Sequence, residues 1–267
     1  MLAVYAAFPA LWERPNLTPV WRFLAFVQNL GLRGGTAFSH AWSLSVEGQF
    51  YLVLPLVLGW IVTRRQAGVA VAAGLVLGGA ILRGVLASSH LTPAGEIDGR
   101  AYLTLIYYPT WSRLDPLVFG VGLAAVRHFR LAWWARLLAA APFLLLPGMA
   151  LVAAGVCLLE ADGLPVTACT LGFPLIALGL AGLLVCAVSE RLPLCRVPVP
   201  GAAFLASIAY SVYLSHKLVI HQAVLFCSAH GWARTSAAAL GLNVAAILLV
   251  GALLYAAVER PFLRWRG

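Results

Sequence analysis

The chain has 267 residues, of which 62% are hydrophobic and only 10% are charged. Soluble globular domains are about half apolar and about a quarter charged, so this composition excludes an ordinary soluble domain and predicts an integral membrane protein in the lipid bilayer. The formal net charge is +9, but the basic residues lie in short clusters between apolar runs, which argues against nucleic-acid binding.

The apolar runs are long enough to cross a bilayer, whose hydrocarbon core requires about 20 residues per helix. The sequence predicts seven spans, at about 46–63, 66–87, 113–127, 134–158, 165–188, 202–226 and 236–258. Residues 1–11 have the character of the second half of another span, and residues 12–41 are predicted to be an interfacial loop with a short helix at 18–30. No long linker divides the chain, so we expect an all-α multi-span bundle forming one domain over residues 1–267.

Basic residues in alternate connections predict the orientation of the chain. More than half of the 18 Lys and Arg residues follow or flank the first, third, fifth and seventh spans: Arg64, Arg65, Arg127, Arg130, Arg136, Arg191, Arg196, Arg260, Arg264 and Arg266. The other connections carry most of the acidic residues. The positive-inside rule therefore predicts an inner (plasma) membrane protein with a cytoplasmic C-terminus and an outward-facing start of the first span.

The five cysteines lie in or beside apolar segments, at positions 157, 169, 186, 195 and 227. Their spacing matches no common metal-binding pattern, so we expect them to be small core side chains. We expect neither a metal site nor a bound cofactor.

The segment HAWSLSVEGQFYLVLP (40–55) begins polar and continues as a membrane helix. Helical spacing would place four side chains on one face: His40, Ser43, Glu47 and Tyr51. A helix start with a serine cap, a favourable glutamate and aromatic anchors would explain part of this pattern. It does not explain the histidine, the tyrosine and Gln49, and ionisable residues at membrane helices usually have a function.

A second polar face is predicted within the sixth span. It consists of Tyr210, Tyr213, Lys217 and His221, again at helical spacing, with His216 beside it. A lysine and two histidines inside an apolar span are expensive, so they too are candidates for a functional site.

The first polar segment resembles the W-S-L-S-V-E-E-Q-F-Y signature of the acyltransferase 3 family of membrane O-acyltransferases. The matching residues are Trp42, Ser43, Leu44, Ser45, Val46, Glu47, Gln49, Phe50, Tyr51 and Pro55. Gly48 departs from the family, which usually has a second glutamate there.

Three further stretches resemble the same family. YYPTWSRLDPLVFGVGLA (107–124) carries its arginine–x–aspartate entry to a glycine-rich helix, with Arg113 and Asp115; a salt bridge that only fixes packing is the alternative reading. ASIAYSVYLSHKLVI (206–220) resembles its S-Y-x-x-Y-L-x-H segment, with Ser215 in place of the usual tryptophan. VERPFLRW (258–265) resembles its closing motif, where we expect a structural clasp.

The resemblance also implies a missing part. Members of the family begin with two to three more spans, which carry a D-G-L-R-like segment and a histidine thought to be the main base. The resemblance therefore implies an N-terminally incomplete domain, from a miscalled start, a truncated gene or a second chain that supplies the missing helices. We expect no acyl transfer by this chain alone; measurable transfer would indicate His40 or His216 as the base.

The resemblance implies transfer of an acyl group, acetyl or similar, from acyl-CoA to a hydroxyl of an extracytoplasmic carbohydrate or related acceptor in the cell envelope. It implies catalytic roles for His40, Glu47 and His216. It implies substrate-binding roles for Ser43, Gln49, Tyr51, Arg113, Asp115, Tyr210, Tyr213 and Lys217. Two alternatives stay open: a transporter or flippase of a polar substrate, and a non-catalytic remnant that binds a partner membrane protein.

Overall fold

The computed structural model of the protein describes residues 1–63, 67–192, 197 and 199–266, and these residues form helices and connecting loops without a strand. Four residues used in the sequence analysis lie outside the described ones: Arg64, Arg65, Cys195 and Arg196. The all-α prediction is confirmed for the described part of the chain.

Six helices among the described residues are long and apolar enough to cross a membrane, so the protein is a multi-pass membrane protein. They cover Ser39–Ile61, Ala67–Ser88, Leu131–Leu159, Val166–Ala187, Ala202–Ala229 and Ala237–Trp265. The third predicted span, 113–127, corresponds to α6 (Asp115–Phe129), which has 15 residues. A helix of that length is about 22 Å long, short of the hydrocarbon core of about 30 Å. The predicted orientation counts this segment as a crossing, so the orientation stays a prediction.

The N-terminal region is less regular than a half-span. Residues 1–11 form α1 (Leu2–Ala7) and η1 (Pro9–Leu11), because Pro9 cannot continue the first helix. The short helix predicted at 18–30 is α2 (Val20–Leu24).

The chain divides by its internal contacts into two compact units, each described by itself. Unit 1 comprises Met1–Leu24, Gly35–Ala41 and Val199–Gly267, and unit 2 comprises Ala25–Gly34 and Trp42–Pro198. The first polar segment contributes to both units. Its beginning, the 3₁₀ turn η2 (Ser39–Ala41), belongs to unit 1, and the helix that follows, α3 (Trp42–Thr63), belongs to unit 2.

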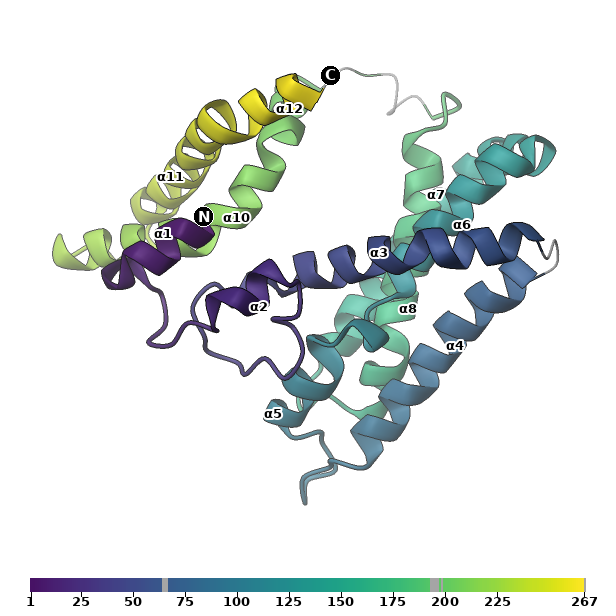
Figure 1. Cartoon of the computed structure of the whole chain (residues 1–267), viewed down its shortest axis with the longest axis horizontal. Helices are drawn as coiled ribbons and strands as arrows, with labels where there is room; N and C mark the ends of the chain where they lie inside the picture. Colours follow the sequence, from purple (N-terminus) through teal and green to yellow (C-terminus); the bar gives the residue numbers. More distant parts are fainter. Residues whose placement is uncertain (64–66, 193–196, 198, 267) are drawn as a thin grey trace. The chain divides into compact units, whose positions relative to one another are not determined.

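In unit 2, α7 (Leu131–Leu159) and α8 (Val166–Ala187) lie side by side along their length (Figure 1). Glycines permit this close approach: a Cβ added at Gly155 would lie 2.8 Å from the Gly172 carbonyl oxygen. Small residues at helix contacts are typical of membrane bundles. The helices α4 (Ala67–Ser88) and α6 pack on α8. Three short elements connect α4 to α6: α5 (Gly99–Ala101), η3 (Tyr102–Tyr107) and η4 (Thr110–Ser112).

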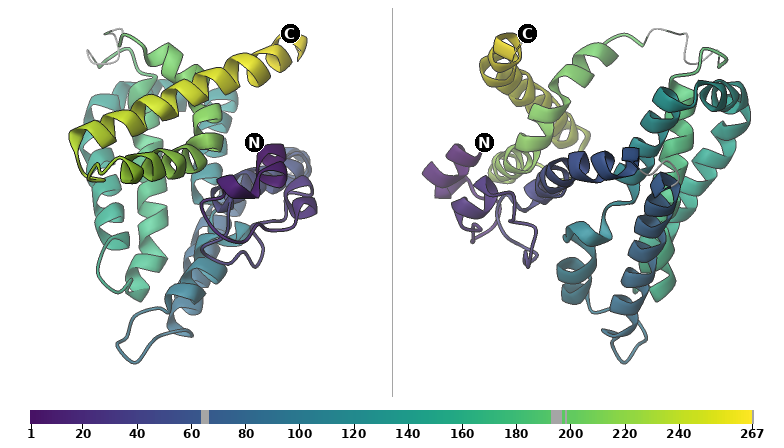
Figure 2. Two further views of the ribbon diagram at one scale, coloured as in Figure 1. Left: turned by 90° about the vertical axis from the view of Figure 1, so that its left-hand side faces the viewer. Right: turned by 45° about the vertical axis from the view of Figure 1, so that its right-hand side comes forward.

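In unit 1, α10 (Ala202–Ala229) packs against α11 (Ala237–Leu254). The chain continues from α11 through the π-helical turn η5 (Tyr255–Glu259) into α12 (Arg260–Arg266), as one long rod (Figure 2). Ser211 on α10 donates a hydrogen bond of 2.8 Å to Glu259, which ties the rod to α10.

Candidate functional site

Unit 1 brings two of the three predicted catalytic residues together. The imidazole of His40, on η2, lies edge-on to that of His216, on α10, with 4.8 Å between ring centroids. The Tyr213 hydroxyl donates a hydrogen bond to the His40 carbonyl oxygen, and the Lys217 ammonium lies 3.4 Å from the Ser39 hydroxyl. We call this group the histidine cluster: Ser39, His40, Tyr213, His216 and Lys217.

The hydrogen bond made by His216 fixes which ring nitrogen is basic. Its Nδ1 lies 2.7 Å from the Tyr213 carbonyl oxygen, which can only accept, so Nδ1 carries the proton. In the neutral ring the other nitrogen, Nε2, then holds an unprotonated lone pair. The His216 side chain is partly exposed, so this lone pair is available to a ligand.

His40 is more deeply buried, with 6% of its surface exposed. Its Nε2 lies 3.4 Å from the Leu214 carbonyl oxygen, while Nδ1 has no hydrogen-bond partner among the described residues. Buried polar atoms are nearly always paired in folded proteins, so an unpaired imidazole nitrogen is an exception that needs an explanation.

The backbone before His40 is held in a strained conformation. Phe38 has a φ of +56°, in the left-handed region that bulky residues avoid. Its N–H donates a hydrogen bond of 2.9 Å to Glu13, and its ring stacks on Tyr5 with 4.5 Å between centroids. The Tyr5 hydroxyl also donates to Glu13, at 3.0 Å. Burial, and secondarily the Glu13 carboxylate, raise the pKa of Tyr5, so its proton stays in place.

Unit 2 contains a buried ion pair that the sequence analysis missed. Arg83, inside α4, donates to both carboxylate oxygens of Asp115, at 2.8 and 3.2 Å, and to the Ser112 carbonyl oxygen at 2.8 Å. Both side chains are almost fully buried. A lone arginine within an apolar span was the available signal, since such a residue is expensive in lipid.

Asp115 therefore pairs with Arg83, and Arg113 is held by aromatic rings instead. The guanidinium carbon of Arg113 lies 4.1 Å from the ring centre of Phe173 and 5.2 Å from those of Trp42 and Tyr107. Burial is the main cause that lowers the pKa of the Arg113 guanidinium, and the nearby Tyr107 phenol opposes that shift. We call Arg113 with its three rings the arginine cage.

Gln49, a predicted substrate-binding residue, makes three hydrogen bonds within unit 2. Its amide donates to the Phe26 carbonyl oxygen at 2.6 Å and to the Asn29 side chain at 2.9 Å, and accepts from the Thr110 hydroxyl at 2.5 Å. Beside it, a Cβ added at Gly48 would lie 2.8 Å from the Phe26 ring. The family's usual glutamate would thus require Phe26 to move.

The remaining predicted site residues have different surroundings. Ser43, Glu47 and Tyr51 lie on α3, so their shared face is that of a regular helix, whereas His40 precedes this helix in η2. Glu47 is exposed and has no hydrogen bond with any described side chain or backbone group. The Tyr51 side chain is also exposed.

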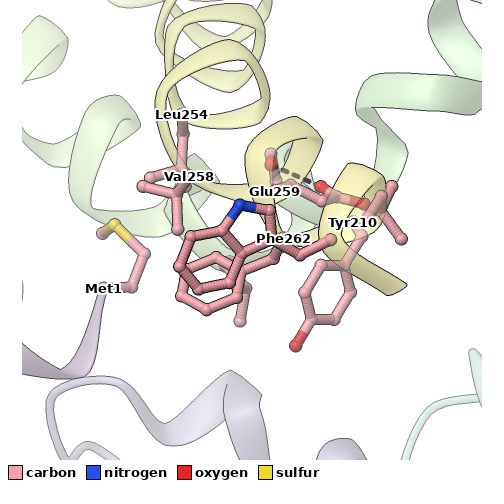
Figure 3. Close-up of a pocket in the computed structure, with 10 residues that line it drawn as sticks. Met1, Tyr210, Leu254, Val258, Glu259 and Phe262 are labelled. Atoms are coloured by element: carbon pink, nitrogen blue, oxygen red, sulfur yellow. Dashed lines mark hydrogen bonds between the residues drawn. The ribbon is translucent and has the colours of Figure 1, made fainter. Parts of the chain in front are cut away.

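Tyr210 lies beside a cavity of about 580 Å³ at the junction of α10, η5 and α12 (Figure 3). Apolar side chains dominate its lining, which includes Leu214, Leu254, Val258, Phe262 and Leu263. Glu259 also lines it, with its carboxylate bound to Ser211. This contact is consistent with the structural clasp expected for the closing motif.

No protein family, curated protein or solved structure matches the chain. Within the described residues, no three His, Cys, Asp or Glu side chains are grouped as a metal site would require. The histidine cluster and the arginine cage therefore remain as the two candidate functional sites among the described residues.

Proposed function

We propose that the protein is an integral-membrane acyltransferase that transfers an acyl group from acyl-CoA to a hydroxyl of an extracytoplasmic carbohydrate or related acceptor. The observation that carries the proposal is the hydrogen bond between Nδ1 of His216 and the Tyr213 carbonyl oxygen, because it favours the neutral tautomer in which Nε2 holds the lone pair. Acyl transfer to a hydroxyl requires such a base.

In the proposed step, Nε2 of His216 takes the proton of the acceptor hydroxyl while the hydroxyl oxygen attacks the thioester carbonyl carbon. The tetrahedral intermediate then collapses with cleavage of the carbon–sulfur bond. The thiolate leaves as the thiol, with the proton that His216 returns, and the acceptor becomes an ester. Lys217, in the same cluster, supplies positive charge that would stabilise the negative oxygen of the intermediate.

The family resemblance supports the choice of acyl-CoA as the donor and of an extracytoplasmic acceptor. It also supports an inner-membrane location with the arginine-rich connections and the C-terminus in the cytoplasm. The family's main base lies in helices that precede the matching region, whereas the present proposal assigns that role to His216. For Glu47, the resemblance alone implies a role in orienting a base or binding an acceptor hydroxyl.

The test uses the purified chain in lipid nanodiscs with acetyl-CoA labelled in the acetyl group. The readout is label transferred to water or to a panel of sugars, because water is the simplest hydroxyl acceptor. The family resemblance implies no acyl transfer by this chain alone, whereas a base at His216 predicts turnover by the wild type. The same proposal predicts a loss of at least about 100-fold in His216→Gln, the usual contribution of a general base.

His230→Gln is the matched control. His230 directly follows α10. Like His216, it contacts a backbone oxygen through Nδ1, here that of Phe226 at 2.8 Å, but it is exposed and outside the cluster. We expect this variant to keep full turnover. Equal turnover in His216→Gln would overturn His216 as the base. No turnover by the wild type would overturn acyl transfer by this chain alone, and would leave the implied missing helices, the transporter and the non-catalytic remnant as the alternatives.

A further inference from the structure

The charges near the start of α6 do not balance. Arg83 and Asp115 form a closed pair, because the two guanidinium nitrogens Nη1 and Nη2 bind the two carboxylate oxygens. Arg113 lies two residues before Asp115 but has neither an ion pair nor a hydrogen bond with any described residue. Among the described residues, Arg113 thus has no ion-pair partner of its own, because Asp115 is bound by Arg83.

Aromatic rings surround this charge without neutralising it. Phe173, Trp42 and Tyr107 attract the guanidinium through their π-electrons, and their ring centres lie 4.1 to 5.2 Å from its central carbon. A guanidinium has five N–H donors, and the π-face of an aromatic ring is not a strong hydrogen-bond acceptor for them. Removing a charge from water without a counter-charge costs free energy. A negatively charged ligand that pairs with Arg113 would explain why the arrangement is kept.

The geometry of the cage indicates which part of Arg113 is left for a ligand. Stacking on rings occupies the face of a guanidinium and leaves its edge, with paired N–H groups, open for bidentate binding. Arg113 is partly exposed, and its N–H groups have no hydrogen-bond partner among the described residues, so they remain for a ligand. A planar fork of N–H donors matches the oxygens of a carboxylate or a phosphate.

We propose that the arginine cage is a binding site for an oxyanion, a carboxylate or phosphate group carried by a ligand of this protein. The site does not depend on the acyl-transfer proposal, since it belongs to unit 2 and uses none of the histidine cluster. Cage aromatics beside the charge also suit a sugar ring that carries the anion, such as a uronic acid or a sugar phosphate.

The experiment measures ligand binding to the purified full chain by the shift of its thermal unfolding midpoint. Glucuronate and glucose form one pair of probes, which differ in the carboxylate, and inorganic phosphate is the third probe. We expect saturable stabilisation by glucuronate or phosphate and none by glucose. The same titration is made in nanodiscs of anionic phosphatidylglycerol and of zwitterionic phosphatidylcholine. A midpoint that is raised by phosphatidylglycerol, and that added glucuronate or phosphate then no longer shifts, would identify the lipid as the source of the oxyanion.

Two substitutions test whether Arg113 carries the binding. Arg113→Gln removes the charge and the fork, and we expect the dissociation constant for the bound anion to rise at least tenfold. Arg113→Lys keeps the charge but not the fork, so we expect an intermediate affinity. Arg100→Gln, an exposed arginine of the same unit, is the control and should bind as the wild type does.

Either of two results would overturn the proposal. One is the absence of binding by every anion, in solution and as lipid. The other is binding that Arg113→Gln and Arg113→Lys leave unchanged. Arg113 forms no ion pair with a described residue, so its substitution leaves no carboxylate buried without a partner, and we expect both variants to fold. If Arg113→Gln is nevertheless unstable, Arg113→Lys still provides the test.

Discussion

The histidine cluster of unit 1 and the Arg83–Asp115 pair of unit 2 both place polar side chains among apolar helices, but they use their hydrogen-bonding capacity differently. Arg83 directs three hydrogen bonds to Asp115 and the Ser112 backbone, and only its Nε atom lacks a described partner. In the cluster, by contrast, His40 Nδ1 has no hydrogen-bond partner among the described residues, and the Nδ1 contact of His216 favours the tautomer with a lone pair on Nε2. The first arrangement holds helices together, and the second keeps reactive atoms available.

The largest expected effect comes from breaking the ion pair. Arg83→Met leaves a buried carboxylate and Asp115→Leu leaves a buried guanidinium, so each should destabilise the protein by about 3–5 kcal/mol. The double variant removes both charges and should recover much of the loss. The measurement is chemical unfolding in detergent micelles, with membrane levels as a second readout. Single variants as stable as the wild type would contradict a structural role for the pair.

Single and double substitutions of His40 and His216 should lower the rate of acyl transfer and leave the stability of the protein unchanged. We expect His40→Gln and His216→Gln to lower acyl transfer by about 10²- to 10⁴-fold each, with unchanged unfolding midpoints. If the two rings act as a unit, the double variant should be no slower than the worse single variant. Multiplicative losses would show instead that the rings act independently.

The contrast also shows what the sequence could and could not predict. The membrane helices and the polar face of α10 follow from local patterns, since apolar length and helical spacing are visible in one segment. The Arg83–Asp115 pair joins residues 32 positions apart, and the sequence left open whether Asp115 forms a salt bridge or binds a substrate. The rings around Arg113 come from distant segments as well, since Trp42 and Phe173 lie far from it in the chain.

In the first polar segment, the feature that helical spacing did not predict is the turn that contains His40. Helical spacing placed His40 on one face with Ser43 and Glu47, but the chain makes a 3₁₀ turn over Ser39–Ala41 before α3 begins. A 3₁₀ helix has fewer residues per turn than an α-helix. The spacing rule of an α-helix therefore does not predict which way the His40 side chain points. Boundaries of this kind depend on contacts from distant residues, here Tyr213 to the His40 backbone.

Glu47 offers a smaller and sharper test of the comparison. It is exposed, so a cap-like role predicts that Glu47→Gln costs only about 0.3–1 kcal/mol of stability and leaves activity intact. A role in orienting a base or an acceptor hydroxyl predicts at least about a tenfold loss of acyl transfer at normal membrane levels. Glu96→Gln, an exposed glutamate of the same unit, is the control.

The smallest effect is expected at Arg113, and it separates the role of Arg113 from that of Arg83. Arg113→Gln without ligand gives up cation–π attraction of about 0.5–2 kcal/mol but also relieves the desolvation of an unpaired charge. These terms oppose each other, so the free energy of unfolding should change by no more than about 1 kcal/mol. Arg83→Gln, measured in the same way, should lose several times more, because it leaves Asp115 buried and unpaired. Equal losses in the two variants would mean that Arg113 is as fully engaged in the folded protein as Arg83, and that its cage has only a packing role.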